Sequence, residues 1–83
     1  MSAVDETTEE LRRARAKFPV FVSAHEGFAI LKEEVDELWD EVKGHHPERM
    51  KRMREEAVQV AAMAIRFIED VCGATLPKRE DEP

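Results

Sequence analysis

Four oxygen-bearing side chains are spaced so that they could surround one metal ion. Glu34 and Glu37 lie three residues apart in the run LKEEVDELWDEV, so both carboxylates would project from one face of a helix. Glu56 and Gln59 have the same three-residue spacing in the later run REEAVQ. If the two runs pack antiparallel, three carboxylates and one amide oxygen can meet between them. Oxygen ligands of this kind suit Mg²⁺ and the phosphate groups that Mg²⁺ binds.

The spacing of these residues resembles the signature of the MazG-like, all-α nucleoside triphosphate pyrophosphohydrolases. That signature is EExxE, then a spacer, then ExxD. Here residues 33–37 read EEVDE, and Glu56 follows after a spacer of eighteen residues. The similarity extends over about residues 23–71 and includes the apolar run after Glu56. The chain departs from the family at the last position, where Gln59 stands in place of an aspartate.

The resemblance implies an enzyme that hydrolyses a nucleoside triphosphate to the monophosphate and pyrophosphate, with a role in nucleotide house-cleaning. Its cofactor would be Mg²⁺, with Mn²⁺ as a substitute, and the ion would bridge phosphate oxygens and offset their charge. Glu33 would act as the catalytic base or as a hydrogen-bond acceptor beside the metal ligands. Arg66 would contact the substrate phosphates, although an ion pair with Asp70 at i+4 explains it equally well. The metal ligands would be Glu34, Glu37, Glu56 and Gln59.

The glutamine at position 59 leaves other functions open. The Gln59 amide oxygen can coordinate a metal, but it is neutral and removes one negative charge from the site. Two alternatives therefore remain: a catalytically degenerate bundle that binds metal without turnover, and a helical module that binds a partner protein. Metal-dependent release of pyrophosphate would separate the enzyme from both alternatives.

Three helices are predicted, near residues 6–17, 22–43 and 48–72, and the fold class is therefore all-α. Thr7 or Thr8 can cap the first helix, which must end before Pro19. This helix is either a lid on the bundle or one wall of a pocket for a nucleobase. Ser23 is placed to cap the second helix, with Glu26 three residues later completing a capping box.

Apolar residues recur at i+3 and i+4 along the second helix from Phe28 to Val42, which is the pattern of an amphipathic helix. On a helical wheel, Glu34 borders this apolar stripe, whereas Glu37 lies further round. The carboxylates are therefore expected at the edge of the packed interface.

The loop around Gly44 and Pro47 is short, so the second and third helices are expected to be antiparallel neighbours. Gly44 suits the end of one helix and Pro47 the first turn of the next. With the turn at residue 46, Glu37 lies nine residues before it and Glu56 ten residues after it. At about 1.5 Å per residue, both lie about 14 Å from the turn. This registry predicts that the two carboxylates meet.

The third helix is apolar on almost every side after Glu56, because ten of the twelve residues in 57–68 are apolar. Such a helix must be buried all round, and two other helices cannot surround it. We therefore expect self-association as a dimer or tetramer, with the second and third helices of two copies forming a four-helix core. Met50 and Cys72 are expected to be packed residues.

Composition limits the other classes of function. The net charge is −6, and no Lys- or Arg-rich block occurs without interspersed acids, which argues against a nucleic-acid polymer as partner. A single cysteine, Cys72, precludes an intramolecular disulfide and favours a reducing cytoplasm. The first residues lack the pattern of a signal peptide, and the apolar run of twelve residues is too short to span a membrane. We expect one cytoplasmic domain at residues 1–76 and a charged, disordered tail at 77–83.

Overall fold

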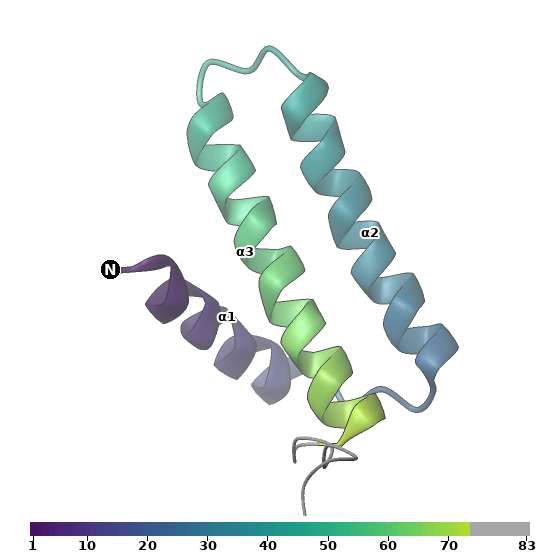
Figure 1. Cartoon of the computed structure of the whole chain (residues 1–83). Coiled ribbons are helices and arrows are strands. Elements are labelled where there is room, and N and C mark those ends of the chain that lie inside the picture. Colours follow the sequence, from purple (N-terminus) through teal and green to yellow (C-terminus); the bar gives the residue numbers. More distant parts are fainter. Residues whose placement is uncertain (74–83) are drawn as a thin grey trace, which may run out of the picture.

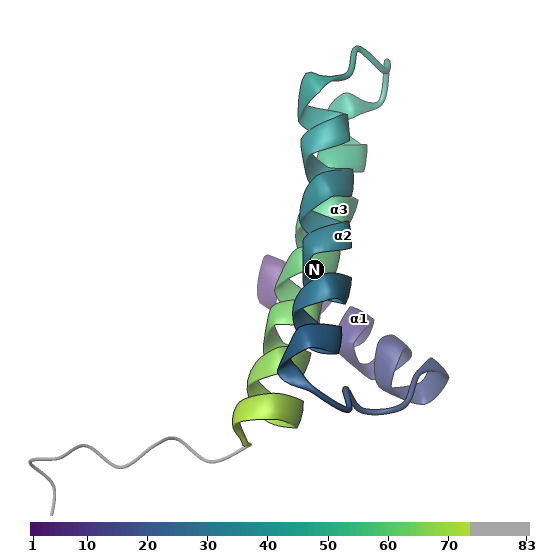
Figure 2. The same cartoon turned by 90° about the vertical axis from the view of Figure 1, so that its right-hand side faces the viewer.

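The computed structural model describes residues 1–73, and this part of the chain is helical without strands. It contains α1 (Ala3–Lys17), α2 (Ala24–Lys43) and α3 (Arg49–Phe67), and α3 continues into a short π-helical segment, η1 (Ile68–Cys72). α2 and α3 run antiparallel and pack along their length, whereas α1 crosses α3 obliquely (Figure 1). In the view turned by 90°, α2 lies in front of α3, and part of α1 extends away from both helices (Figure 2). The all-α prediction is confirmed, and the predicted disordered tail lies outside the described residues.

The first helix begins earlier than predicted, because its cap is Ser2 and neither threonine serves this purpose. The Ser2 hydroxyl accepts a hydrogen bond from the Asp5 N–H at 3.1 Å, and the Asp5 carboxylate accepts one from the Ser2 N–H at 3.4 Å. This capping box places α1 from Ala3 onward. The Thr7 and Thr8 hydroxyls instead donate to backbone carbonyls four residues earlier, as they do inside a helix.

The second helix begins at the predicted cap and is packed tightly at its first turn. The Ser23 hydroxyl accepts a hydrogen bond from the Glu26 N–H at 3.1 Å, while the Glu26 carboxylate reaches the Val22 N–H. Gly27 follows where two aromatic rings meet α2: a Cβ at this position would lie 2.8 Å from Phe67 Cδ2 and 3.0 Å from Phe21 Cδ2. Glycine therefore allows α2 to approach the end of α3.

The loop between α2 and α3 differs in detail from the expectation. Gly44 ends α2 with a φ of −76°, so its lack of a side chain is not required by the backbone there. Pro47 precedes the third helix by two residues and is not in its first turn. His46 Nδ1 instead accepts a hydrogen bond from the Glu48 N–H at 3.0 Å, which shapes the turn before α3.

Two ion pairs and a hydrogen bond hold the end of α1 and the connector after it against η1, which continues α3. The Arg15 guanidinium lies 2.6 Å from the Glu69 carboxylate and 3.0 Å from that of Asp70. Asp70 also accepts a hydrogen bond from the Phe21 N–H at 3.1 Å. Burial opposes ionisation of Asp70, but the Phe21 N–H and the Arg15 charge outweigh it and lower the Asp70 pKa. These contacts hold Phe21 against the C-terminal part of α3, where its ring packs on the Arg66 guanidinium.

The hydrophobic core is thin. Its buried members are Ala14, Phe21, Ala62 and Met63, and partly buried leucine, isoleucine and phenylalanine side chains surround them. Two residues expected to pack are in fact exposed: Met50, which is 76% exposed, and Cys72. Met50 lies in the first turn of α3 and Cys72 at the end of η1, and no described element packs over either residue. None of the helices in residues 1–73 has both the length and the hydrophobicity needed to cross a membrane.

Candidate metal and substrate site

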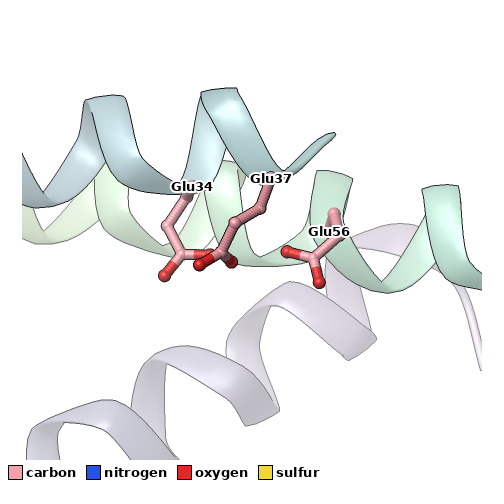
Figure 3. Close-up of side chains that lie close together, drawn as sticks. All are labelled: Glu34, Glu37 and Glu56. Carbon is pink, nitrogen blue, oxygen red and sulfur yellow. The ribbon is translucent and has the colours of Figure 1, made fainter. Parts of the chain in front are cut away.

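The structure brings together three of the four residues proposed as metal ligands. α2 contributes Glu34 and Glu37, α3 contributes Glu56, and one carboxylate oxygen of each lies within 4.8 Å of the other two. The three side chains converge on the side of the α2–α3 pair that faces α1 (Figure 3). The antiparallel registry of the two helices is sufficient to produce this arrangement. We call these three residues the acidic cluster.

Burial and mutual repulsion raise the proton affinity of the acidic cluster. Burial, followed by the charge and hydrogen bonding of Glu37, raises the pKa of Glu34 from its ordinary 4.5 to about 7. Burial and the same neighbour also raise the pKa of Glu56. No Lys, Arg or His nitrogen among residues 1–73 lies within 4.0 Å of these carboxylates. The described residues therefore place no direct ion pair on the acidic cluster.

One oxygen of the acidic cluster is left without a hydrogen bond. Glu56 Oε2 is buried and has no partner, although buried carboxylate oxygens are normally satisfied. A divalent cation fits such a group, because it supplies the missing electrostatic partner and removes the repulsion among the carboxylates. The three carboxylates are therefore an all-oxygen donor set of the kind that divalent cations take.

Gln59 and Glu33 occupy different positions relative to the acidic cluster. Gln59 lies one turn after Glu56 on α3, and the two line the same hollow beneath α1 together with Glu34. Its amide can therefore face a ligand bound there. Glu33 is exposed and is not one of the converging carboxylates, but it lines the neighbouring cavity beside Glu34.

The sequence interpretation missed two basic residues of α1. A hollow of about 340 Å³ separates α1 from the acidic cluster, and Arg13 and Lys17 line it opposite the glutamates. Arg13 pairs with Glu10 at 2.9 Å but remains largely exposed, and Lys17 lies over the Phe18 ring at 5.4 Å. Their i, i+4 spacing was a signal that they share one face of α1. The direction of that face is set by how α1 crosses α3, which the sequence pattern does not reveal.

Arg66 is buried beside the site and does not form the ion pair considered for it. It is only 3% exposed, and Asp70 is paired with Arg15 instead. The Arg66 guanidinium donates to the Pro19 carbonyl at 3.0 Å and to Met63 Sδ at 3.4 Å. It also stacks over the Phe21 ring, with 4.2 Å between Cζ and the ring centre. Its Nε is buried without a hydrogen-bond partner.

A second cavity, of about 370 Å³, connects Arg66 to the acidic cluster. Apolar side chains from the three helices and from the connector form much of its wall, including Ile30 and Met63. Glu34 and Gln59 line this cavity as well as the hollow beneath α1, so the two spaces adjoin at these residues. The site is thus an acidic centre with an apolar pocket next to it.

Comparisons with known proteins find no match to this chain among family models, curated proteins or solved structures. The geometry of the site and the motif in the sequence are therefore the features that bear on function.

Proposed function

We propose that this protein is a Mg²⁺-dependent nucleoside triphosphate pyrophosphohydrolase, which converts an NTP or dNTP to the monophosphate and pyrophosphate. The observation that carries the proposal is the acidic cluster: three carboxylates from two helices converge within 4.8 Å, and one buried oxygen has no partner. The resemblance of these residues to the MazG-like motif supports the same activity. An adjoining apolar cavity provides room for the rest of a nucleotide.

Each part of the site has a role in this proposal. Glu34, Glu37 and Glu56 hold the cation, and Gln59 adds its amide oxygen. When bound, Mg²⁺ offsets the charge of the phosphate oxygens and lowers the pKa of a coordinated water. Glu33, exposed beside Glu34, accepts a proton from the attacking water.

The basic residues of α1 complete the polar side of the site. Arg13 and Lys17 face the acidic cluster across the hollow, so they can donate to phosphate oxygens that extend from the cation. Arg66 was the sequence-based candidate for phosphate contact. It lines the apolar cavity and not the hollow at the acidic cluster.

Gln59 gives the second candidate function. It is a neutral residue at the edge of a site with three carboxylates, so the charge available to hold metal is one unit lower than in the motif. A bundle that binds metal without turnover would keep the acidic cluster and lose the reaction. Thermal stabilisation by Mg²⁺ without pyrophosphate release identifies this case, and a pure interaction module shows neither effect.

The decisive assay is pyrophosphate release from canonical and modified nucleoside triphosphates, with Mg²⁺, Mn²⁺ or a chelator. Glu56→Gln removes a proposed ligand, and we expect turnover to fall at least 100-fold. The matched control is Asp36→Asn, which neutralises an exposed carboxylate on α2 that pairs with Lys32. The proposed activity would be refuted if no nucleotide released pyrophosphate. It would also be refuted if Glu56→Gln left the rate of pyrophosphate release unchanged.

We also propose that two copies associate through the exposed apolar row of α2. Phe28, Val35 and Val42 lie seven residues apart on α2 and are 60%, 45% and 37% exposed, so they form one open row along the helix. Trp39 beside this row is 56% exposed. Large apolar groups aligned in this way favour a partner surface of the same kind.

Sedimentation of the parent and of Val35→Glu tests the association. We expect a dimer or tetramer for the parent and a monomer for the variant, because a buried unpaired charge opposes the interface. Val4→Glu is the control, since Val4 is 74% exposed on α1. A folded 9.6 kDa monomer at micromolar concentration would contradict the association.

A further inference from the structure

Arg66 is a buried cation that binds the backbone of the connector between α1 and α2, residues 18–23. The residue is 3% exposed and carries a permanent charge. Its guanidinium donates to the Pro19 carbonyl at 3.0 Å, and its Cζ lies 4.2 Å from the centre of the Phe21 ring. Burial of a charge is unfavourable, so the hydrogen bond to the connector is the feature that an apolar side chain at this position would not provide.

Asp70 binds the same connector from the next turn of the helix. Its carboxylate accepts a hydrogen bond from the Phe21 N–H at 3.1 Å and pairs with Arg15 of α1 at 3.0 Å. Arg66 and Asp70 lie four residues apart, which is a helical rise of about 6 Å. Pro19 and Phe21 lie two residues apart, which spans at most about 7 Å of extended chain. The two spacings match, so a donor on α3 meets a backbone carbonyl while an acceptor on η1 meets a backbone N–H.

Packing alone sets the angle of α1 on α3 only loosely. Ala14 is the buried residue of α1, and Leu11 is partly buried beside it. Near the start of α1, Glu6 and Arg54 pair at 2.9 Å, but the Arg54 side chain is 55% exposed, and exposed ion pairs contribute little. Crossing angles of packed helices scatter by about 15–20°. The connector therefore supplies a restraint that fixes where the C-terminal half of α1 lies.

The angle of α1 decides whether its basic residues face the acidic cluster. Arg13 and Lys17 line the hollow there, and Arg13 lies six residues before Pro19, about 9 Å along the helix axis. A rotation of about 20° at the connector would move Arg13 by about 3 Å, which is the length of a hydrogen bond. The acidic cluster itself comes from α2 and α3, and Glu56 lies about 15 Å along α3 from Arg66. Its geometry therefore does not depend on the connector.

We propose that Arg66 and Asp70 are positioning residues, which bind the connector backbone and thereby hold the basic residues of α1 at the hollow beside the acidic cluster. The consequence for turnover rests on the proposed function, because it concerns the same site. The placement of α1 can be measured without substrate or metal. A purely structural role of the two residues would instead lower the stability of the whole domain without moving α1 in the protein that stays folded.

The position of α1 is measured by double electron–electron resonance between nitroxide labels on α1 and α2. Arg12→Cys and Asp36→Cys place the labels on exposed residues, and Cys72→Ser removes the exposed native cysteine. We expect a narrow distribution of label distances in the parent. In Arg66→Met and in Asp70→Ala the distribution should become about twice as wide, because α1 then samples the range of angles that packing allows.

Arg49→Met is the matched control, because Arg49 also lies on α3 and its guanidinium donates to a backbone carbonyl, that of Val42, at 2.7 Å. That carbonyl lies at the far end of α2, so its loss should leave the label distances unchanged. Arg66→Lys should restore most of the narrow distribution, since its ammonium can donate to the Pro19 carbonyl.

Three results would overturn the proposal. The first is a parental width in folded Arg66→Met and Asp70→Ala, and the second is equal broadening by Arg49→Met. If Arg66→Met does not fold, as shown by far-UV circular dichroism, Asp70→Ala decides alone. The third result is that neither variant folds, because a structural role then accounts for both residues.

Metal titrations and enzyme assays separate this inference from the proposed function. Arg66→Met should keep the rise in Tm that Mg²⁺ gives the parent, because the acidic cluster is intact, and should raise KM about tenfold. Lys17→Met should raise KM in the parent and have little further effect in Arg66→Met, since residues that act through one another are not additive. A parent that releases no pyrophosphate would refute the enzyme, while the label distances still decide the role of Arg66 and Asp70. Pyrophosphate release together with parental distances in both variants would refute the positioning role and leave the enzyme.

Discussion

Neutralising one glutamate of the acidic cluster should stabilise the metal-free protein at neutral pH. The Glu34 pKa is raised to about 7 in the folded protein, against an ordinary 4.5. Below pH 4.5 the carboxyl is protonated in both the folded and the unfolded chain. As the pH rises towards 7, the unfolded chain has lost its proton while the folded protein retains it, so folding is increasingly opposed. Above pH 7 the full penalty is present.

The size of the effect follows from the two pKa values. A difference of about 2.5 corresponds to about 3 kcal/mol, at about 1.4 kcal/mol for each factor of ten in proton affinity. Glu34 is only partly buried, and solvent screening reduces this figure to about 1–2 kcal/mol. In a domain of this size that corresponds to a rise in Tm of roughly 5–15 °C for Glu34→Gln at pH 8.

Thermal unfolding in a chelator at pH 4 and pH 8, at one protein concentration, measures the effect. The variant and the parent should differ by this amount at pH 8 and little at pH 4. In saturating Mg²⁺ the order should reverse, because the variant lacks a ligand. Glu9→Gln is the control, since Glu9 is an exposed glutamate on α1 outside the acidic cluster. Equal shifts for both variants, or a Glu34→Gln shift that is the same at the two pH values, would refute the reasoning.

Three further substitutions test other parts of the structure. Gln59→Asp should lower the metal-free Tm, because it adds an anion beside three others, and should increase the rise in Tm on titration with Mg²⁺; an unchanged metal response would separate Gln59 from the site. Gly27→Ala should reduce the free energy of unfolding in urea by about 1–3 kcal/mol, because its Cβ would lie 2.8 Å from Phe67 Cδ2, and an unaffected variant would contradict that packing. Asp70→Asn should lower Tm at pH 7 by weakening the bond to Arg15, and the difference should shrink as the pH falls, because the stabilisation from the lowered Asp70 pKa is lost on protonation. A difference that grows towards acid pH would contradict this role of Asp70.

The sequence was informative where local rules decide the structure. Helical periodicity and the short loop at Gly44 predicted the antiparallel contact of α2 and α3, which the structure confirms. The same registry anticipated that Glu37 and Glu56 would lie at one height. The start of α1 was wrong because Thr7 and Thr8 were preferred as caps, although Ser2 and Asp5 already formed a capping box.

The sequence was less informative about contacts that depend on how α1 lies on α3. The crossing of these helices places Arg13 and Lys17 over the acidic cluster, and no spacing rule fixes such an angle. The partner of Arg66 was also not predictable from i, i+4 spacing. Arg15 comes from another helix and binds Asp70 at 3.0 Å, which leaves Arg66 to the Pro19 carbonyl.

The acidic cluster and the Arg66 cavity adjoin, so the proposed function predicts that metal binding and nucleotide binding are coupled. Three carboxylates converge in the acidic cluster, and buried Arg66 Nε has no acceptor among the described residues. Glu34 and Gln59 line both the hollow at the acidic cluster and the cavity at Arg66. With four buried apolar residues in the core of residues 1–73, a small domain has little stability to offset unfavourable charges. In the proposed function, the metal meets the acidic cluster while the rest of the nucleotide occupies the adjoining cavity. Joint binding of metal and nucleotide should therefore raise Tm by more than the sum of their separate effects. Simple additivity in a thermal titration would show that the acidic cluster and the Arg66 cavity serve separate ligands.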